Sequence, residues 1–363
     1  MVTVFSWLIS VVVLGLLVLV HELGHFLVAK RVGVRVLRFS IGFGPIIARW
    51  RRGETDYALS LLPLGGYVKM AGEGQEDQRH EPGEFLSQPI GVRAKIVLAG
   101  PAVNYLVSIV TLWVVLVVGY PELSPVVGRV IDDMPAQAAG LRVGDRIRAI
   151  DHQPITTWDE LTRSVRRHPG QPIALSVERA GAPLSLTAVP SAKELPDPFG
   201  RVQRVGLLGV SPSGEFHTFR VSPWQAIGAT AQRQAEWAGQ IAMSLWALFT
   251  GRASPRESLT GPIGILHLTS EAARMGVGAL LYLVSLFSLS LAVFNLFPLP
   301  VLDGGHLFFM ACEKLRGRPI SVRWRERATQ VSVAFLLALV VMVCINDLVR
   351  LGVVDKVATW WKS

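Results

Sequence analysis

The stretch VLVHELGHFLVA, residues 18–29, places three ionisable side chains in an otherwise apolar run close to the N-terminus. In a helix, residues four apart share one face, so His21 and His25 present two imidazoles to a single zinc ion, with Glu22 alongside as a general base. Ionisable groups at the centre of a membrane helix cost about 2.5–3.5 kcal/mol each, so three together need a compensating partner. The run predicts a zinc site inside a membrane helix; a packed polar cluster or a proton relay is the alternative.

A third ligand is expected from another segment at the same membrane depth, because catalytic zinc usually keeps three protein ligands and one open position. Asp303, in FNLFPLPVLDGGH (residues 294–306), meets this requirement because it follows the third apolar run near the end expected to face the cytoplasm. The prolines and glycines of this motif break the helix and free backbone groups close to the site. The alternative role for Asp303 is capping of the next helix, and the competing ligands are His306, Glu313 and His267.

The composition predicts a membrane protein. Half of the 363 residues are hydrophobic, only 17% are charged, and the mean hydropathy is +0.41. The formal charge of +9 does not indicate a nucleic-acid partner, because the basic residues flank the apolar runs and form no stripe with stacking aromatics. Cys312 and Cys344 have neither metal nor redox spacing, and no disulfide is predicted.

Four apolar runs predict a polytopic α-helical protein, with spans at Val2–Ala29, Ile96–Gly119, Leu280–Leu302 and Val331–Leu351. The loops 30–95 and 304–330 are rich in Lys and Arg, so both are expected on the cytoplasmic side. Residues 120–275 and both termini then lie outside. The expected division is 1–119 (first two spans), 120–193 (soluble domain), 194–275 (linker and amphipathic interfacial helix) and 276–363 (last two spans).

The segment 34–70 between the first two spans predicts β-hairpins at the cytoplasmic face. It alternates loosely, is punctuated by glycine and proline, and contains RRGE as a turn. Several of its side chains are too apolar for full exposure, so contact with membrane lipid is expected: Phe39, Ile41, Phe43, Ile46 and Ile47.

Residues 125–190 predict a compact soluble α+β block. PVVGRVID, DRIRAIDHQPI, IALSVERAG and PLSLTAVP read as strands, and AQAAG and WDELTRSVRRHP as helices. Further on, a long amphipathic helix is expected at residues 222–249, with Trp224, Trp237 and Trp246 suited to a membrane interface.

Together, HELGH, GFGP, GPAVN (residues 100–104) and NLFPLPVLDGGH resemble the site-2 protease intramembrane metalloproteases, in particular the regulator-of-sigma-E protease branch. The resemblance implies a zinc metalloendopeptidase in which His21, His25 and Asp303 hold Zn²⁺ and Glu22 is the catalytic base. It implies substrate-binding roles for Asn295 and for the β segment Gly42, Phe43 and Gly44, where the substrate would be held as an added strand.

The resemblance also implies partners and location. The substrates would be single-pass membrane proteins, such as anti-sigma factors or signal-peptide remnants, cut in regulated intramembrane proteolysis in the bacterial cytoplasmic (inner) membrane. AGLRVGDRIRAIDHQPI (residues 139–155) resembles a PDZ domain, here in one copy, whereas some members of this branch carry two.

Two other functions are consistent with parts of the pattern. A non-catalytic membrane PDZ adaptor would use the metal structurally, but closed structural sites usually fill all four positions with protein ligands, and only three are found here. A metal transporter is disfavoured by a single site and the lack of repeated acidic residues in the spans.

Overall fold

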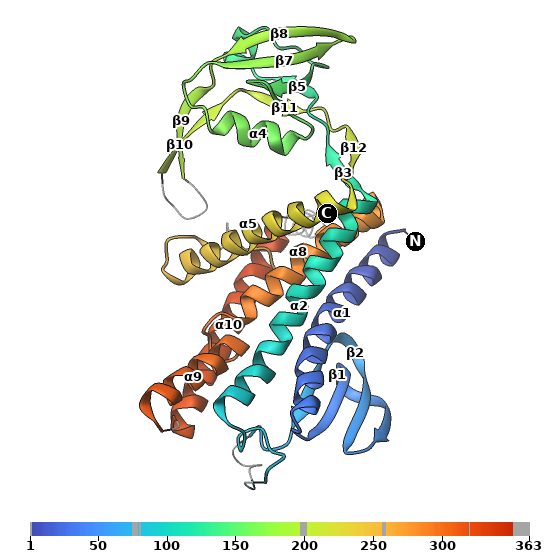
Figure 1. Cartoon of the computed structure of the whole chain (residues 1–363), viewed down its shortest axis with the longest axis vertical. Helices are drawn as coiled ribbons and strands as arrows, with labels where there is room; N and C mark the ends of the chain where they lie inside the picture. The colour runs from blue at the N-terminus through green and yellow to red at the C-terminus, as the bar shows by residue number, and fades with distance from the viewer. Residues whose placement is uncertain are drawn as a thin grey trace, which may run out of the picture. The chain divides into compact units, whose positions relative to one another are not determined.

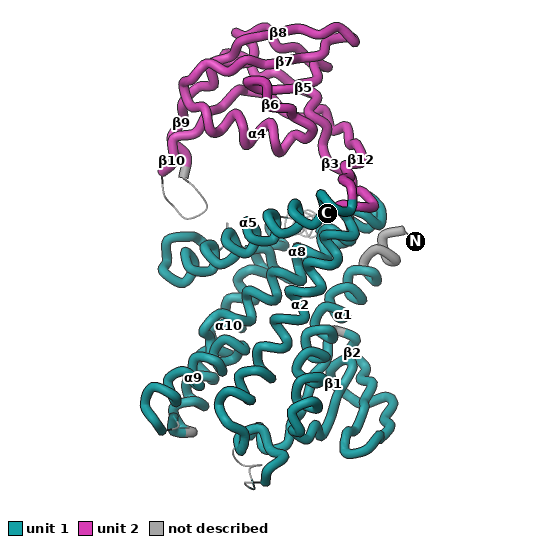
Figure 2. Tube along the Cα trace, viewed as in Figure 1, with its two compact units in different colours: residues 1–115, 223–363 teal, residues 116–222 magenta. Residues whose placement is uncertain are grey.

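The computed structural model describes residues 2–74, 79, 81–196, 202–255, 259–318 and 320–350. The chain divides into two compact units, shown in Figure 2. Unit 1 comprises Met1–Val115 and Pro223–Ser363, and unit 2 comprises Leu116–Ser222.

Unit 1 contains the helices that are long and apolar enough to cross a membrane. Among the described residues there are four: α1 (Val2–Arg31), α2 (Ile90–Val118), α8 (Val277–Asn295) and α10 (Val322–Arg350). The expected fold class is therefore confirmed, with four candidate membrane helices and a separate β-rich unit. The helix boundaries differ from the predicted spans at several ends. Helices α2, α8 and α10 begin earlier than predicted, at Ile90, Val277 and Val322. Helix α8 ends at Asn295, seven residues before the predicted Leu302, because Pro298 and Pro300 cannot continue a helix.

Helix α2 lies between α1 and α8 (Figure 1). It contacts α1 through Ile96, whose carbonyl lies 2.8 Å from Nδ1 of His25. It contacts α8 through Ser108, whose hydroxyl donates to the carbonyl of Ser285 at 2.7 Å. At such helix crossings, small polar side chains form hydrogen bonds with the neighbouring helix where no water is available.

Among the described residues, three further helices lie between the spans: α5 (Pro223–Phe249), α7 (Pro262–Met275) and α9 (Asp303–Arg316). Helix α5 is the predicted amphipathic helix, whereas α7 was not predicted. The N-terminus of α7 is capped from α10: Gly261 and Gly264 donate backbone N–H groups to the carboxylate of Asp347 at 3.2 and 2.8 Å. Because its cap comes from a residue far along the chain, α7 has no local start signal beyond Pro262.

The predicted β-hairpin region consists of two long strands, β1 (Val36–Arg52) and β2 (Thr55–Met70), which contact α1. Phe39 has two partners in the sheet, Val68 and Tyr57, so the first part of β1 lies between two parts of β2. Gly42 permits this folding back: its φ is +89°, and a Cβ there would lie 2.6 Å from the carbonyl oxygen of Leu62.

The described part of unit 2 consists of short strands and two helices. Its largest sheet has the order β6 (Gln153–Pro154), β5 (Arg146–Ile150), β7 (Ile173–Arg179), β8 (Ala182–Ala188). Three two-stranded sheets accompany it: β3 (Tyr120–Leu123) with β12 (Phe216–Phe219), β4 (Val127–Val130) with β11 (Val210–Pro212), and β9 (Ser191–Pro196) with β10 (Val202–Leu207). The helices are α3 (Pro135–Ala138) and α4 (Trp158–Arg166).

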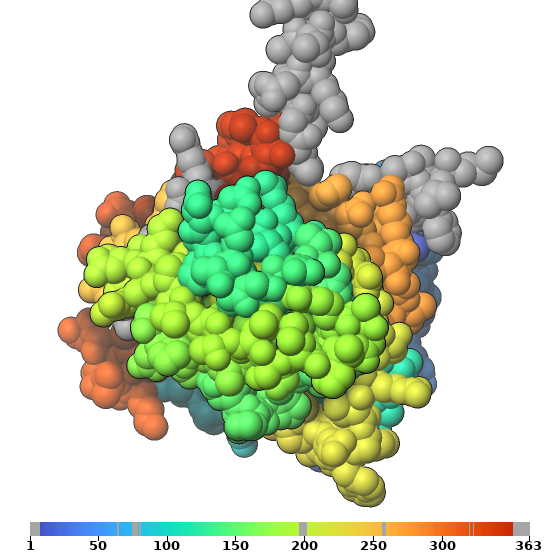
Figure 3. Space-filling model, turned by 90° about the horizontal axis from the view of Figure 1, so that it is seen from above, coloured from blue at the N-terminus to red at the C-terminus, as the bar shows by residue number. Residues whose placement is uncertain are grey.

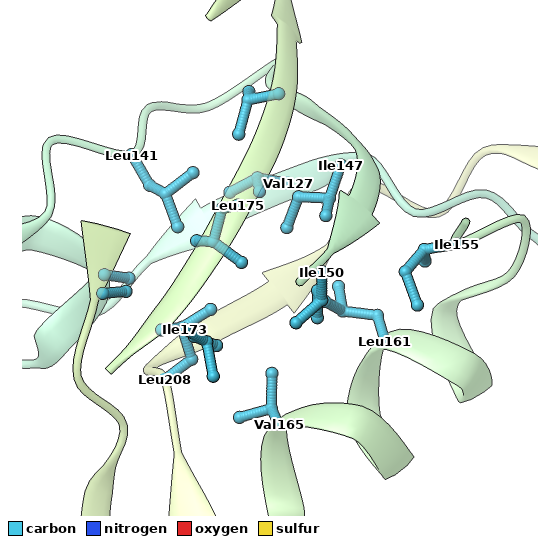
Figure 4. Close-up of a cluster of buried hydrophobic side chains, with 13 residues drawn as sticks. Val127, Leu141, Ile147, Ile150, Ile155, Leu161, Val165, Ile173, Leu175 and Leu208 are labelled. Atoms are coloured by element: carbon cyan, nitrogen blue, oxygen red, sulfur yellow. The ribbon is translucent and has the colours of Figure 1, made fainter. Parts of the chain in front are cut away.

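The hydrophobic core of unit 2, shown in Figure 4, is formed by apolar residues that recur at the spacing of a strand in β7 and of a helix in α4. In β7 every second side chain points inward, so Ile173, Leu175 and Val177 are all buried. In α4 the buried side chains Leu161 and Val165 are four apart. In the space-filling view, the unit's segments, coloured from blue-green to yellow-green, form one closely filled body (Figure 3).

Candidate metal centre

The zinc motif lies on α1, with both imidazoles turned to the same side. His21 and His25 are buried, and their Nε2 atoms are 3.1 Å apart. The helix can bring them against α2 because residue 24 is glycine: a Cβ at Gly24 would lie 2.5 Å from the carbonyl oxygen of Ala99. Helices α1 and α2 therefore approach each other closely at the HELGH motif.

Asp303 reaches the same place from the other end of the chain. Its Oδ2 lies 3.0 Å from His21 Nε2 and 3.4 Å from His25 Nε2. Asp303 is the first residue of α9. The two glycines that follow it allow the start of this helix to pack closely against the preceding loop. A Cβ at Gly304 or Gly305 would lie 2.2 or 2.1 Å from a carbonyl oxygen of that loop. The tight turn carries Asp303 into the site.

These three residues fit a zinc ion. One ligand atom from each lies within 4.8 Å of the others, and this is the one such cluster among the described residues. Asp303 Oδ2 is buried yet accepts no hydrogen bond of acceptable geometry from any described residue, as expected of an atom that coordinates a cation. Two imidazoles and a carboxylate are zinc ligands, and three of them leave one position open.

Of the competing ligands, Glu313 is engaged elsewhere. It forms a 2.7 Å ion pair with Arg93 of α2, whose side chain is almost fully buried. His306 and His267 are not members of the metal-binding cluster found among the described residues. The structure therefore assigns the third ligand position to Asp303.

Glu22, the residue after His21, is half-buried beside the metal ligands. Its Oε2 accepts a hydrogen bond of 3.1 Å from the backbone N–H of Val68 in β2. The β sheet thus holds one oxygen of this carboxylate in a defined direction.

The predicted substrate-binding residues lie on two elements. Asn295 ends α8, and its Nδ2 is 3.4 Å from His21 Nε2. Gly42, Phe43 and Gly44 lie on β1, where both glycines have positive φ and Phe43 stacks on Tyr67. Asn295 thus lies next to a residue of the zinc group, whereas the other three residues belong to the neighbouring sheet.

The model of a known family, "Peptidase family M50", matches residues 9–339. The chain belongs to peptidase family M50. This M50 peptidase is 37% identical to a putative zinc metalloprotease of Rhizobium meliloti (strain 1021), over 92% of this chain and 94% of the relative. It is 32% identical to the regulator of sigma-E protease RseP of Escherichia coli (strain K12), over 96% of this chain and 99% of the relative. The PDZ domain of the SdrC-like protein of Listeria monocytogenes matches 26% of this chain and 88% of its own length, at 20% identity and a TM-score of 0.20.

Membership of the family confirms the predicted enzyme class. The M50 peptidase is an intramembrane zinc metalloprotease and a multi-pass membrane protein, and its zinc group is His21, His25 and Asp303.

Sequence reasoning assigned no role to the residues of α2 that meet the histidines. Besides Ile96, these are Gly100, which faces both imidazoles, and Asn104, whose side chain lies 3.3 Å from His21. Gly100 and Asn104 are the first and last residues of GPAVN. The four-residue spacing between them was the available signal, because it puts both on the helix face that meets α1.

Proposed function

We propose that this M50 peptidase hydrolyses peptide bonds within or near the membrane-spanning segment of single-pass membrane proteins. The observation that carries the proposal is the position of two zinc ligands, His21 and His25, in the candidate span Leu8–Arg31. At a helical rise of ~1.5 Å per residue, His25 and His21 lie about 8 and 14 Å along the helix from Lys30. A peptide bond must enter the depth of the span to reach them.

Glu22 is proposed as the catalytic base. Zinc supplies polarisation of the scissile carbonyl and activation of water. Two observations support this role: Glu22 is one residue from a ligand, and the N–H of Val68 orients its carboxylate, which would take the proton of the attacking water. The same carboxyl group then protonates the leaving amine.

We propose that β1 and Asn295 hold the substrate backbone. A peptide bond inside a helix is shielded from attack, so the substrate has to be extended, and strand addition provides that geometry. The register of β1 against β2 shifts on both sides of Phe43, and the substrate strand would be added at this bend. The amide of Asn295 lies close to His21 and would donate a hydrogen bond to a substrate carbonyl near the reacting bond.

The physiological substrates are proposed to be anti-sigma factors or signal-peptide remnants, cut in regulated intramembrane proteolysis in the bacterial inner membrane. The E. coli relative is named as a regulator of sigma-E. The charge bias of the loops 30–95 and 304–330 supports a cytoplasmic location for the zinc end of α1 and an extracytoplasmic location for unit 2.

The proposal is tested by reconstituting the purified protein in liposomes with a labelled peptide that has one membrane span. A second peptide carries the same scissile sequence without the flanking apolar residues. We expect cleavage of the first peptide at a bond within its span, mapped by mass spectrometry, and loss of cleavage after chelation of zinc. Preferential cleavage of the soluble peptide would overturn the substrate class. Zinc binding without cleavage of either peptide would favour a metal-stabilised adaptor.

A further inference from the structure

The two zinc-binding histidines direct the same nitrogen to the metal group. Their Nε2 atoms are 3.1 Å apart, and both lie within 3.4 Å of Asp303 Oδ2. A neutral imidazole that offers Nε2 to a metal ion carries its proton on Nδ1. Each histidine therefore has one N–H donor pointing away from the metal, and each donor needs an acceptor.

For His25 this acceptor is a backbone carbonyl. Its Nδ1 lies 2.8 Å from the oxygen of Ile96 on α2, a distance typical of a good N–H···O hydrogen bond. The tautomer of His25 is thus set by the main chain of the neighbouring helix.

For His21 the neighbour is the side chain of Asn104, also on α2 and fully buried. Asn104 Nδ2 lies 3.3 Å from His21 Nδ1, which would place two N–H donors face to face. A half-turn of the amide exchanges its nitrogen and oxygen, which have nearly the same size. Asn104 Oδ1 has no hydrogen-bond partner among the described residues, so the half-turn breaks no other bond to that atom. The proton on His21 requires the oxygen to face it.

We propose that Asn104 is a positioning residue for zinc: its amide oxygen accepts the Nδ1 proton of His21, as the carbonyl of Ile96 does for His25. Helix α2 then supplies the outer acceptors of both imidazole ligands. Such acceptors fix the tautomer and orientation of a ligating histidine, and their loss typically costs about 10- to 100-fold in metal affinity. The proposal rests on the zinc group alone and not on the proposed substrate.

The backbone of Asn104 is held separately, which provides a matched control. Ser288 of α8 donates its hydroxyl proton to the Asn104 carbonyl at 2.8 Å. Ser288→Ala removes this contact between α2 and α8 but leaves the amide and His21 untouched.

The test measures zinc affinity of the full-length protein in detergent by competition with a chromophoric chelator, together with the visible spectrum of the cobalt-substituted protein. We expect Asn104→Ala to weaken zinc binding about 10- to 100-fold and to change the cobalt spectrum. Asn104→Asp keeps an oxygen acceptor of nearly the same shape, so it should bind zinc within a few-fold of the parent. Ser288→Ala should match the parent in both measurements.

Two results would overturn the proposal. One is parental zinc affinity in Asn104→Ala. The other is an equal loss in Asn104→Asp and Asn104→Ala, which would show that the amide N–H faces His21. If Asn104→Ala fails to fold, judged by circular dichroism and elution volume, Asn104→Asp decides alone, because the two amide orientations predict opposite results for it.

Discussion

Gly100 approaches His25 so closely that a Cβ at residue 100 would lie 2.3 Å from His25 Nε2. The same atom would lie 2.7 Å from Cε1 of His21. Carbon atoms are not found at such distances from non-bonded atoms in folded proteins, so one of the groups has to move. The absent side chain of Gly100 leaves the space in which the two ligating imidazoles meet.

We therefore expect Gly100→Ala to displace the imidazoles and to lower zinc affinity by at least about 10-fold, the lower end of the effect of disturbing the surroundings of a ligand. The measurement is metal content after dialysis against a zinc buffer. Gly91→Ala, on the same helix, is the control, because a Cβ there has no neighbour within 4 Å. Full zinc occupancy in Gly100→Ala would show that α1 and α2 separate easily.

The role of Glu22 is tested by separating metal binding from turnover. Glu22→Gln removes the base but no metal ligand, so zinc content should stay at the parental level while kcat falls by about 10²- to 10⁴-fold. His21→Ala and Asp303→Ala should lose both zinc and activity. If Glu22→Gln retained most of its turnover, another group would have to accept the proton of the water.

Unit 2 contains an ion pair between the buried Asp145 and the partly exposed Arg179, and this pair should make the stability of the unit depend on acid pH. The carboxylate of Asp145 is buried and accepts hydrogen bonds from Arg179 Nε at 2.7 Å, Arg179 Nη2 at 2.8 Å and the N–H of Arg142 at 2.8 Å. Burial by itself would raise the pKa of Asp145, but these hydrogen bonds and the positive charge of Arg179 lower it below its ordinary value. A carboxyl group whose pKa is lowered by folding stabilises the folded state at pH values above its pKa in the unfolded chain, which is about 3.9 for Asp.

This stabilisation should disappear as the pH falls from about 5 through the lowered pKa of folded Asp145. Asp145→Asn removes a buried acceptor of three hydrogen bonds and the charged partner of Arg179, so it should lower the free energy of unfolding at neutral pH by about 1–3 kcal/mol. It should also remove part of the acid dependence. Urea unfolding of residues 116–222 at several pH values measures both. The exposed pair of Arg148 and Glu178 is the control: Glu178→Gln should change stability by less than about 1 kcal/mol.

The orientation in the membrane is tested by thiol labelling of intact cells with an impermeant reagent. Ser213 of unit 2 and Ser321, between α9 and α10, are both exposed and provide one reporter for each side. We expect Ser213→Cys to react directly, and Cys312 and Ser321→Cys to react only after the cells are permeabilised. The reverse pattern would invert the proposed topology.

The contribution of unit 2 is tested by excising it. The chain enters and leaves this unit at adjacent points: Val221 donates its N–H to the carbonyl of Leu116 at 2.9 Å, and Tyr120 pairs with Phe219. Deleting residues 120–219 and joining Gly119 to Arg220 should therefore leave the membrane helices intact. If unit 2 gates access, the truncated protein should still cut a short transmembrane peptide and should also cut a substrate with an untrimmed external domain.

Two other outcomes of the excision are distinguishable from gating. Removal of a substrate's external domain creates a new C-terminus on the substrate. If the truncated protein cuts such trimmed substrates more weakly and leaves untrimmed ones uncut, unit 2 captures this new C-terminus. Loss of all activity with zinc retained would indicate that unit 2 supports the active site directly.

The sequence by itself determined the features that depend on local spacing. The histidines of HELGH share a face because they are four apart on one helix, and the four spans follow from apolar length. In unit 2 the alternation of Ile173, Leu175 and Val177 predicts a half-buried strand. None of these inferences needs a contact between distant segments.

Only the tertiary structure decided which distant groups complete the site. The sequence left Asp303 in competition with His306, Glu313 and His267, and the tight turn at Gly304 and Gly305 settled it. Other parts of the site likewise depend on segments that are far apart in the chain. The N–H of Val68 donates to Glu22, the carbonyl of Ile96 lies against His25, and Gly100 leaves room for both imidazoles. Helix α7 escaped prediction for the same reason, because the carboxylate that caps it belongs to Asp347 of α10. The distance and direction between two helices depend on how all their side chains pack together, so one segment alone does not contain them.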